Sequence, residues 1–277
     1  MKFPSVFLIT LGFGWAIGCS IGPPRPQPGS DAFLWSEAKR SYRIGDFLRT
    51  DSILLRLSGA DSPYATEARV WQLIVSAGLT QGFSELADAY ERGSLHDTAN
   101  PLRFRNQADK LRSFAATTAL EFAQAVHDIT SNRAAATFEL AFAFPAGSAV
   151  PPEELLKISY GVWPGESDRE SVETAMLRRG VLRAVSTAVG YPEDPASALA
   201  AFQSTAGCIQ REVFISGMAG LLFEQSDLFG AHRMNRPDRF ILMCRAAKDA
   251  LQSIPQSDET NKLATQIESA LKKSAGI

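Results

Sequence analysis

Apolar positions recur every three to four residues along most of the chain, which is the periodicity of helices that bury one face. The pattern predicts helices over residues 31–44 and 47–58, each ended by a glycine. A third helix is predicted from 63 to 78 and a fourth from 84 to 93, with a turn at Gly82-Phe83 between them. Residues 31–93 are therefore expected to form two successive helical hairpins.

The same periodicity continues to the end of the chain. A long helix begins at Asn100-Pro101 and runs to about residue 131. Ser167 and Glu170 have the spacing of a capping box at the start of a strongly patterned helix. The other predicted helices cover residues 153–159, 195–206, 211–225 and 237–251, and a last one carries Leu263, Ile267 and Leu271. The sequence predicts an all-α fold built as an irregular solenoid of helical hairpins.

Residues 137–144 depart from this pattern. Phe138, Leu140, Phe142 and Phe144 alternate with smaller or polar residues, which is the period of a strand. The alternatives are an extended apolar segment packed on the helices, a strand that pairs with another chain, and a short buried helix; the extended form is favoured. No partner strand is evident in the sequence. The surrounding Pro- and Gly-rich stretch, 132–165, is the predicted connection between helical regions 31–131 and 166–277.

The first eighteen residues have the pattern of a signal peptide. Lys2 precedes an apolar run from Phe3 to Gly18 that contains no charged residue. Sixteen helical residues span only about 24 Å, which is short of the roughly 30 Å hydrocarbon core of a bilayer. A short apolar core that ends in small residues is typical of a cleaved leader. Residues 19–30, with four prolines, then predict an extended linker.

The leader ends in Ala16-Ile17-Gly18-Cys19, which resembles the lipobox of bacterial lipoproteins, with Ala16 in place of the usual Leu. This resemblance implies cleavage between Gly18 and Cys19, with diacylation of the Cys19 thiol and acylation of the new amino terminus. It also implies a palmitate-type anchor in the bacterial cell envelope, facing the periplasm. By the same resemblance, Ser20 after the cysteine implies sorting to the outer rather than the inner membrane. The alternative is an ordinary secretory leader in which Cys19 is incidental.

Residues 31–93 resemble tetratricopeptide repeats. The residues that carry the resemblance are Leu34, Ala38, Tyr42, Gly45-Asp46-Phe47 and Leu54 for the first repeat, and Ala68, Trp71, Gly82-Phe83, Ala87 and Tyr90 for a degenerate second one. The two turn glycines are 37 residues apart rather than 34, and Thr50 and Leu57 replace the usual alanines. The resemblance implies a concave surface that binds a protein partner.

Composition narrows the functional classes. The formal net charge is −2, so there is no electrostatic basis for nucleic-acid binding. With Cys19 assigned to lipid, Cys208 and Cys244 remain as a pair. They are predicted either to form a disulfide or to be two buried thiols, and the sequence leaves both open. No His or Cys has the spacing of a metal site, and no cofactor is expected.

Residues that carry chemistry are sparse. His96, His127 and His232 are far apart, and neither a nucleophile elbow nor a phosphate-binding glycine loop is present. No catalytic residue is proposed, and the protein is not expected to be an enzyme. The segment 230–239 could bind an anionic ligand or form a salt-bridged connection, and the second is favoured. The predicted interaction surface comprises Tyr42, Trp71, Tyr90, Phe138, Phe142, His232, Arg233 and Arg236.

These observations support a lipid-anchored, non-enzymatic helical scaffold or accessory subunit that binds another envelope protein. The alternative is a periplasmic ligand-binding accessory of a transport system, with an apolar cavity for a small ligand. In that case the Phe-rich segment 138–144 would line or plug the cavity. An enzyme, such as a hydrolase, is the least favoured class.

Overall fold

The computed structural model describes residues 26–59, 61–131 and 135–274. Within these residues the regular structure is almost entirely helical, which confirms the predicted all-α class. The helices are α1 (Asp31–Ile44), α2 (Phe47–Ser58), α3 (Ala65–His96), α4 (Pro101–Ser131), α5 (Glu153–Ser159), α6 (Glu166–Ala188), α7 (Pro195–Ser204), α8 (Arg211–Ser226), α9 (Pro237–Gln252) and α10 (Asp258–Ser274). Two short strands, β1 (Thr137–Glu139) and β2 (Cys208–Gln210), and a 3-10 turn, η1 (Asp227–Phe229), complete the described structure.

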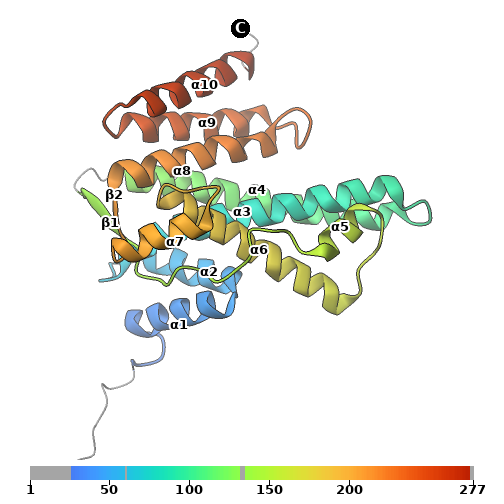
Figure 1. The fold of residues 1–277 in the computed structure, drawn as a ribbon, viewed down its shortest axis with the longest axis horizontal. Coiled ribbons are helices and arrows are strands. Elements are labelled where there is room, and N and C mark those ends of the chain that lie inside the picture. The colour runs from blue at the N-terminus through green and yellow to red at the C-terminus, as the bar shows by residue number, and fades with distance from the viewer. Residues whose placement is uncertain (1–25, 60, 132–134, 275–277) are drawn as a thin grey trace, which may run out of the picture.

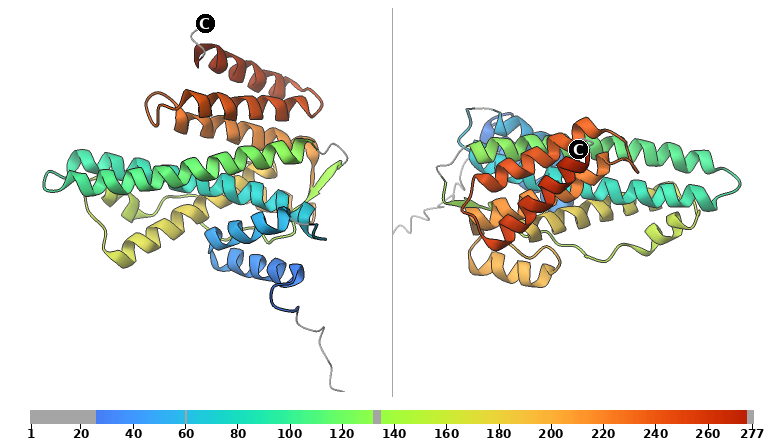
Figure 2. Two further views of the ribbon diagram at one scale, coloured as in Figure 1. Left: turned by 180° about the vertical axis from the view of Figure 1, so that it is seen from behind. Right: turned by 90° about the horizontal axis from the view of Figure 1, so that it is seen from above.

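A long hairpin of α3 and α4 forms the centre of the molecule (Figure 1). Helices α2 and α1 pack in succession on one side of it, and α8, α9 and α10 stack on the other, so α1 and α10 lie at opposite ends (Figures 1 and 2). Helix α6 packs along α3, and α7 packs on α6. Every later element is therefore positioned by α3 directly or through one neighbour.

Helix α3 is continuous where the sequence predicted a turn. It runs through Gly78 and Gly82 without a break, so the second predicted hairpin turn is wrong. Both glycines are contact points for α6: a Cβ at Gly78 would lie 2.5 Å from the Cα of Val181. A Cβ at Gly82 would lie 2.8 Å from the carbonyl oxygen of Met176. Close packing of α6 offsets the roughly 1 kcal/mol by which each glycine weakens a helix.

The first predicted hairpin is confirmed. Helix α1 ends at Gly45, whose φ of 87° lies in the left-handed region that favours glycine. Helix α2 then begins after Asp46, whose side chain accepts a hydrogen bond from the Arg49 N–H at 3.1 Å. In contrast, the capping box predicted at Ser167 is wrong, because α6 begins at Glu166 and its N-cap, Gly165, has no side chain to accept a bond.

The segment after residue 136 is extended, as the alternation predicted. Strand β1 pairs antiparallel with β2, and Phe138 is opposite Ile209 in the register. The partner strand comes from the same chain, with Ile209 lying 71 positions after Phe138, so the alternative of a buried helix is wrong. β2 is only three residues long and precedes α8 directly, which is why no strand period marked it in the sequence.

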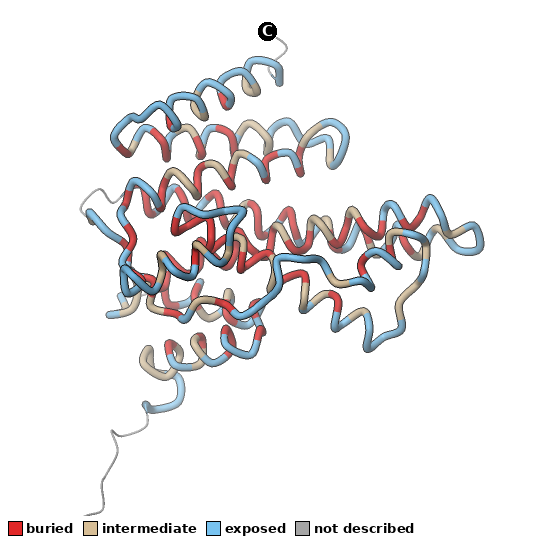
Figure 3. The backbone as a smooth tube through the Cα atoms, in the orientation of Figure 1, coloured by how far each residue is buried: buried red, intermediate tan, exposed pale blue. Residues whose placement is uncertain are grey.

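One apolar core runs through the molecule, from Trp35 in α1 to Ile267 in α10 (Figure 3). It includes residues of both predicted helical regions, such as Ile74 of α3 and Val185 of α6, which are fully buried. The Pro- and Gly-rich connection 132–165 therefore does not separate two cores.

Candidate functional site

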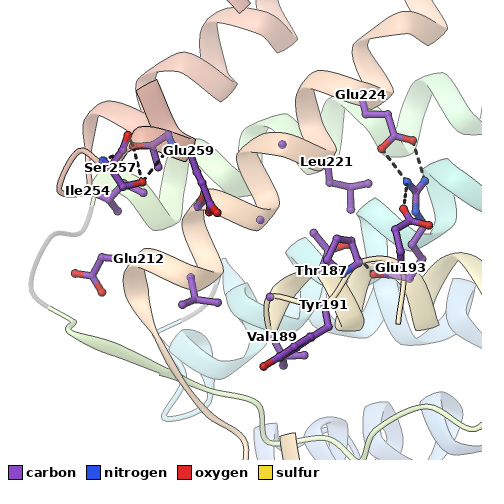
Figure 4. A pocket seen from close by; sticks show the side chains of 18 of the residues that line it. Thr187, Val189, Tyr191, Glu193, Glu212, Leu221, Glu224, Ile254, Ser257 and Glu259 are labelled. Carbon is purple, nitrogen blue, oxygen red and sulfur yellow. Dashed lines mark hydrogen bonds and ion pairs between the residues drawn. The ribbon is translucent and has the colours of Figure 1, made fainter. Parts of the chain in front are cut away.

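A cleft of about 750 Å³ opens between the end of α6, one face of α8 and the connection from α9 to α10 (Figure 4). We call it the acidic cleft. Its floor is formed by Val213, Ser216, Gly217, Gly220 and Leu221 of α8. One wall consists of Arg183, Thr187 and residues 189–193, and the other of residues 254–257, Glu259 and Thr260, with Glu212 at the rim.

Close backbone packing sets the shape of the α6 wall. Gly217 of α8 contacts Thr187 of α6 so tightly that any Cβ on Gly217 would collide with the Thr187 carbonyl oxygen. Gly190, with a φ of 91°, lies against α8, since a Cβ there would be 3.1 Å from Val213 Cγ1. Tyr191, the next residue, is 44% exposed, and Val213 on the floor of the cleft is 41% exposed. The cleft therefore presents apolar side chains to solvent at its base.

The opposite wall is fixed by a reciprocal cap at the start of α10. The Ser257 N–H donates to Thr260 Oγ1 at 2.7 Å, and the Thr260 N–H donates to Ser257 Oγ at 3.2 Å. Ile254 anchors the preceding turn in the core. This capping arrangement places Glu259 in the first turn of α10, where the helix dipole favours a negative charge.

The cleft carries a surplus of negative charge. Four glutamates, Glu193, Glu212, Glu224 and Glu259, line it against the single cation Arg183, which gives a formal charge of −3. Arg183 donates to both oxygens of Glu224, at 2.8 and 3.0 Å, and to Glu193 at 3.4 Å. Within the described ranges, Glu212 and Glu259 form no ion pair. Figure 4 shows these two carboxylates on one side of the cleft and Glu193 and Glu224 on the other.

The aromatic residues of the predicted interaction surface lie in the core instead. Tyr42, Trp71, Tyr90, Phe138 and Phe142 are each at most 6% exposed. Trp71 stacks on Phe142 with ring centroids 4.5 Å apart, and the Tyr42 ring packs edge-on against Trp71 at 5.0 Å. Their prediction as a surface is wrong, because helical spacing marks a buried face of a helix as readily as an exposed aromatic stripe.

The basic residues of the 230–239 segment form a salt-bridged connection, which is the alternative that the sequence favours. Arg233 contacts Asp88 of α3 at 3.0 Å and Asp227 at 3.3 Å, and it donates to Ser84 Oγ at 2.9 Å. Arg236 contacts Asp238 at 3.3 Å. His232 is exposed on the same segment. The arginines thus join the 230–236 turn to α3 and to the start of α9 rather than converging on a cavity.

Cys208 and Cys244 are both free thiols. Cys208 is exposed on β2, while Cys244 is buried in α9 with its Sγ 3.5 Å from Ser226 Oγ. The predicted disulfide is therefore wrong, and the alternative of two buried thiols is correct only for Cys244.

The signal cleavage and lipidation positions, Gly18 and Cys19, lie outside the described residues. Among the helices of the described ranges, none combines the length and apolarity needed to cross a membrane. In the same ranges, no three His, Cys, Asp or Glu side chains gather as a set of metal ligands.

A separate polar site lies between α2, α3 and α4. The Ser76 hydroxyl is 3.2 Å from Asp51 Oδ1. Burial, and secondarily the nearby Glu121 carboxylate, raise the pKa of Asp51 to about 7. Burial also raises the pKa of Glu121. This pair is a structural source of pH dependence at a distance from the acidic cleft.

The sequence predicted none of the residues of the acidic cleft as a site. They come from three segments, 183–193, 212–224 and 254–260, and each glutamate alone has the appearance of a solvated surface residue. The signal that could have found this region is the pair Gly217 and Gly220, because glycines within a nearly all-apolar helix favour close packing of that helix. Comparisons of the chain with protein-family models, curated proteins and solved structures found no match. The class of the protein is therefore defined by its all-α fold and its open acidic cleft.

Proposed function

We propose that this protein is a lipid-anchored, non-enzymatic accessory subunit of the bacterial envelope that binds a protein partner in the acidic cleft. The anchor is supported by the lipobox-like leader ending at Cys19. The binding role is supported by one observation: an open cleft with exposed apolar side chains at its base and two carboxylates, Glu212 and Glu259, that form no ion pair within the described ranges.

The charge of the cleft specifies its occupant. Glu212 and Glu259 form no ion pair within the described residues, and Arg183 is already held by Glu224. A segment bearing Lys or Arg near an apolar side chain would pair with these carboxylates and cover Val213 and Tyr191. Complementary charge of this kind speeds encounter and selects the partner, while the apolar contact supplies affinity. The occupant is therefore a basic segment of another envelope protein.

Site-specific photo-crosslinking in intact cells tests this binding role. A benzoylphenylalanine at Val213, on the cleft floor, should crosslink one envelope protein through a peptide that carries Lys or Arg. The same probe at Val150, which is 73% exposed outside the cleft, is the matched control. Glu212→Lys combined with Glu259→Lys should abolish the crosslink, whereas Glu154→Lys on α5 should leave it unchanged. Crosslinking that is equal at both probe positions, or that survives the double charge reversal, contradicts the proposal.

The anchor has its own test, which separates its failure from failure of the cleft. Cys19→Ser should end labelling by radioactive palmitate and release the protein from the membrane fraction. Labelling that persists in the variant would refute lipidation at Cys19.

A further inference from the structure

A second cavity, of about 350 Å³, lies between α1, the start of α2, α6 and the extended segment that follows β1. We call it the basic-aromatic pocket. The residues that line it are Lys39, Tyr42, Arg43, Phe47, Ala141, Phe142, Ala143, Phe144, Pro145, Ala146 and Arg178. The set contains three cations, four aromatic rings and no acid. Its charge is therefore opposite to that of the acidic cleft.

The three cations of this pocket are not neutralised by the protein. Among the described residues, none of Lys39, Arg43 and Arg178 forms an ion pair. Glu37, on the same helix, is directed to Arg40 and Arg49 instead, at 3.5 and 2.9 Å. Three like charges around one cavity repel one another unless an anion joins them.

Arg178 is held in position by two glycines. A Cβ at Gly147 would lie 3.2 Å from Arg178 Cγ, and a Cβ at Gly45 would collide with the guanidinium. Arg178 also donates a hydrogen bond to the Ile44 carbonyl oxygen at 3.3 Å, and this bond orients the planar guanidinium group. A guanidinium oriented before binding loses little conformational entropy when it binds a carboxylate or phosphate.

The apolar part of the pocket contains an unused hydrogen-bond donor. The Tyr42 hydroxyl is buried and has no hydrogen-bond partner in the described structure. Burial raises the pKa of Tyr42, so this hydroxyl stays protonated at neutral pH. Phe142, which packs on Tyr42 with ring centroids 5.1 Å apart, and Phe144 complete an apolar surface beside the cations. A bound molecule would need both an acidic group and an apolar body to match this lining.

We propose that the basic-aromatic pocket binds a small organic anion, a carboxylate or phosphate monoester carried on a short apolar body. The acidic group would lie between Lys39, Arg43 and Arg178, and the apolar body against Phe142 and Phe144. The volume is at the lower end of the range for small-molecule sites, which restricts the ligand to a chain of up to about eight carbons beyond its acidic group. This site is independent of the partner-binding role of the acidic cleft.

Isothermal titration calorimetry on the full chain in phosphatidylcholine nanodiscs tests the proposal. Octanoate and octyl phosphate are the probes, with octanol as the neutral analogue and inorganic phosphate as the anion without an apolar body. We expect saturable 1:1 binding of at least one octyl anion, weakened by salt, and much weaker binding of octanol and of inorganic phosphate.

Matched variants assign the binding to this pocket. Arg178→Gln and Lys39→Gln should each weaken binding at least tenfold. Arg43→Gln, at an exposed position where the fold is insensitive to the change, should also weaken it. Arg40→Gln, on α1 but outside the pocket, should bind like the wild type. The absence of saturable binding for both octyl anions, or equal affinity in all four variants, would overturn the proposal.

The lipid composition of the nanodiscs distinguishes two sources of the anion, a lipid headgroup and a free small molecule. If phosphatidylglycerol nanodiscs lower the apparent affinity for octyl phosphate in the wild type but not in Arg43→Gln, the pocket is occupied by lipid headgroups. If the wild-type affinity is the same in both kinds of disc, the ligand is a free small molecule. Either result supports the anion site.

Discussion

Gly180 of α6 lies against Gly78 of α3 so closely that a Cβ on Gly180 would collide with the Gly78 carbonyl oxygen. This contact sets how near α6 approaches α3, and α6 in turn carries Arg178 to one pocket and Arg183 to the other. The two backbones approach at this point because both positions lack a side chain.

Gly180→Ala should therefore lower the free energy of unfolding by about 3 kcal/mol, because the added methyl group meets rigid backbone. Gly59→Ala is the matched control, since a Cβ there would meet only the Leu55 carbonyl oxygen at 3.7 Å. Urea denaturation measures both changes. A Gly180→Ala protein as stable as the wild type would show that α6 does not approach α3 this closely.

Phe142→Ala should destabilise the protein by about 3 to 5 kcal/mol, because Phe142 is 3% exposed and packs on Trp35, Tyr42 and Trp71. Val150→Ala, at an exposed position, should change stability by less than about 0.5 kcal/mol. Thermal and urea unfolding provide the measurement. If Phe142→Ala weakened partner binding and left stability unchanged, Phe142 would belong to an interaction surface and not to the core.

Arg233→Gln should lower the free energy of unfolding by about 1 to 2 kcal/mol at neutral pH, because it leaves the partly buried Asp88 without its ion-pair partner. Burial, the largest cause, raises the pKa of Asp88, and Arg233 opposes that shift. Loss of Arg233 raises this pKa further, so the destabilisation should shrink as the pH falls and Asp88 becomes neutral. Arg236→Gln, whose partner Asp238 is exposed, should change stability little at any pH.

Asp51→Asn should stabilise the protein at alkaline pH. The folded pKa of about 7 is above the ordinary 3.8, so the folded state holds the proton more tightly than the unfolded chain does. The contribution of Asp51 to stability is complete below about pH 4 and is lost as the pH rises through 7. Asp51→Asn should therefore match the wild type at about pH 4 and exceed it by about 1 to 3 kcal/mol at pH 8.

Asp97 supplies the control of opposite sign for that pH experiment. Its pKa is lowered, chiefly because it accepts the Asn100 N–H and also because Arg103 lies 3.0 Å away. The ionised Asp97 side chain therefore stabilises the folded protein above the ordinary pKa of an aspartate. This stabilisation is lost as the pH falls through the lowered pKa of the folded state. Asp97→Asn should therefore reduce stability at neutral pH and lose this effect in acid. Parallel pH profiles for the two variants would contradict both assignments.

A thiol reagent should modify Cys208 in the folded protein and should reach Cys244 only after unfolding. Cys208 is exposed and Cys244 is buried, where desolvation raises the pKa of its thiol. Mass spectrometry before and after unfolding in denaturant, without reductant, counts the modified sites. If neither residue reacts in the unfolded chain until a reductant is added, the two form a disulfide.

The sequence by itself determined the helical class, the first hairpin and the extended character of the segment after residue 136. These depend on local chemistry: apolar spacing along one helix face, the left-handed Gly45, the Asp46 cap and the alternation around Phe138. Such signals act within one or two turns of chain, so they can be read without knowing what packs against them.

Only the tertiary structure decided where those elements meet. Gly78 and Gly82 have the local appearance of a turn, yet α6 packs on them, about a hundred positions away in sequence, and the helix continues. In the same way, β2 is a strand only because it pairs with β1. The aromatic residues Tyr42, Trp71 and Tyr90 belong to the core only because neighbouring elements cover them. Both pockets combine charges from segments far apart in sequence. Packing between distant segments sets these features, because the free energy of a contact depends on both of its sides.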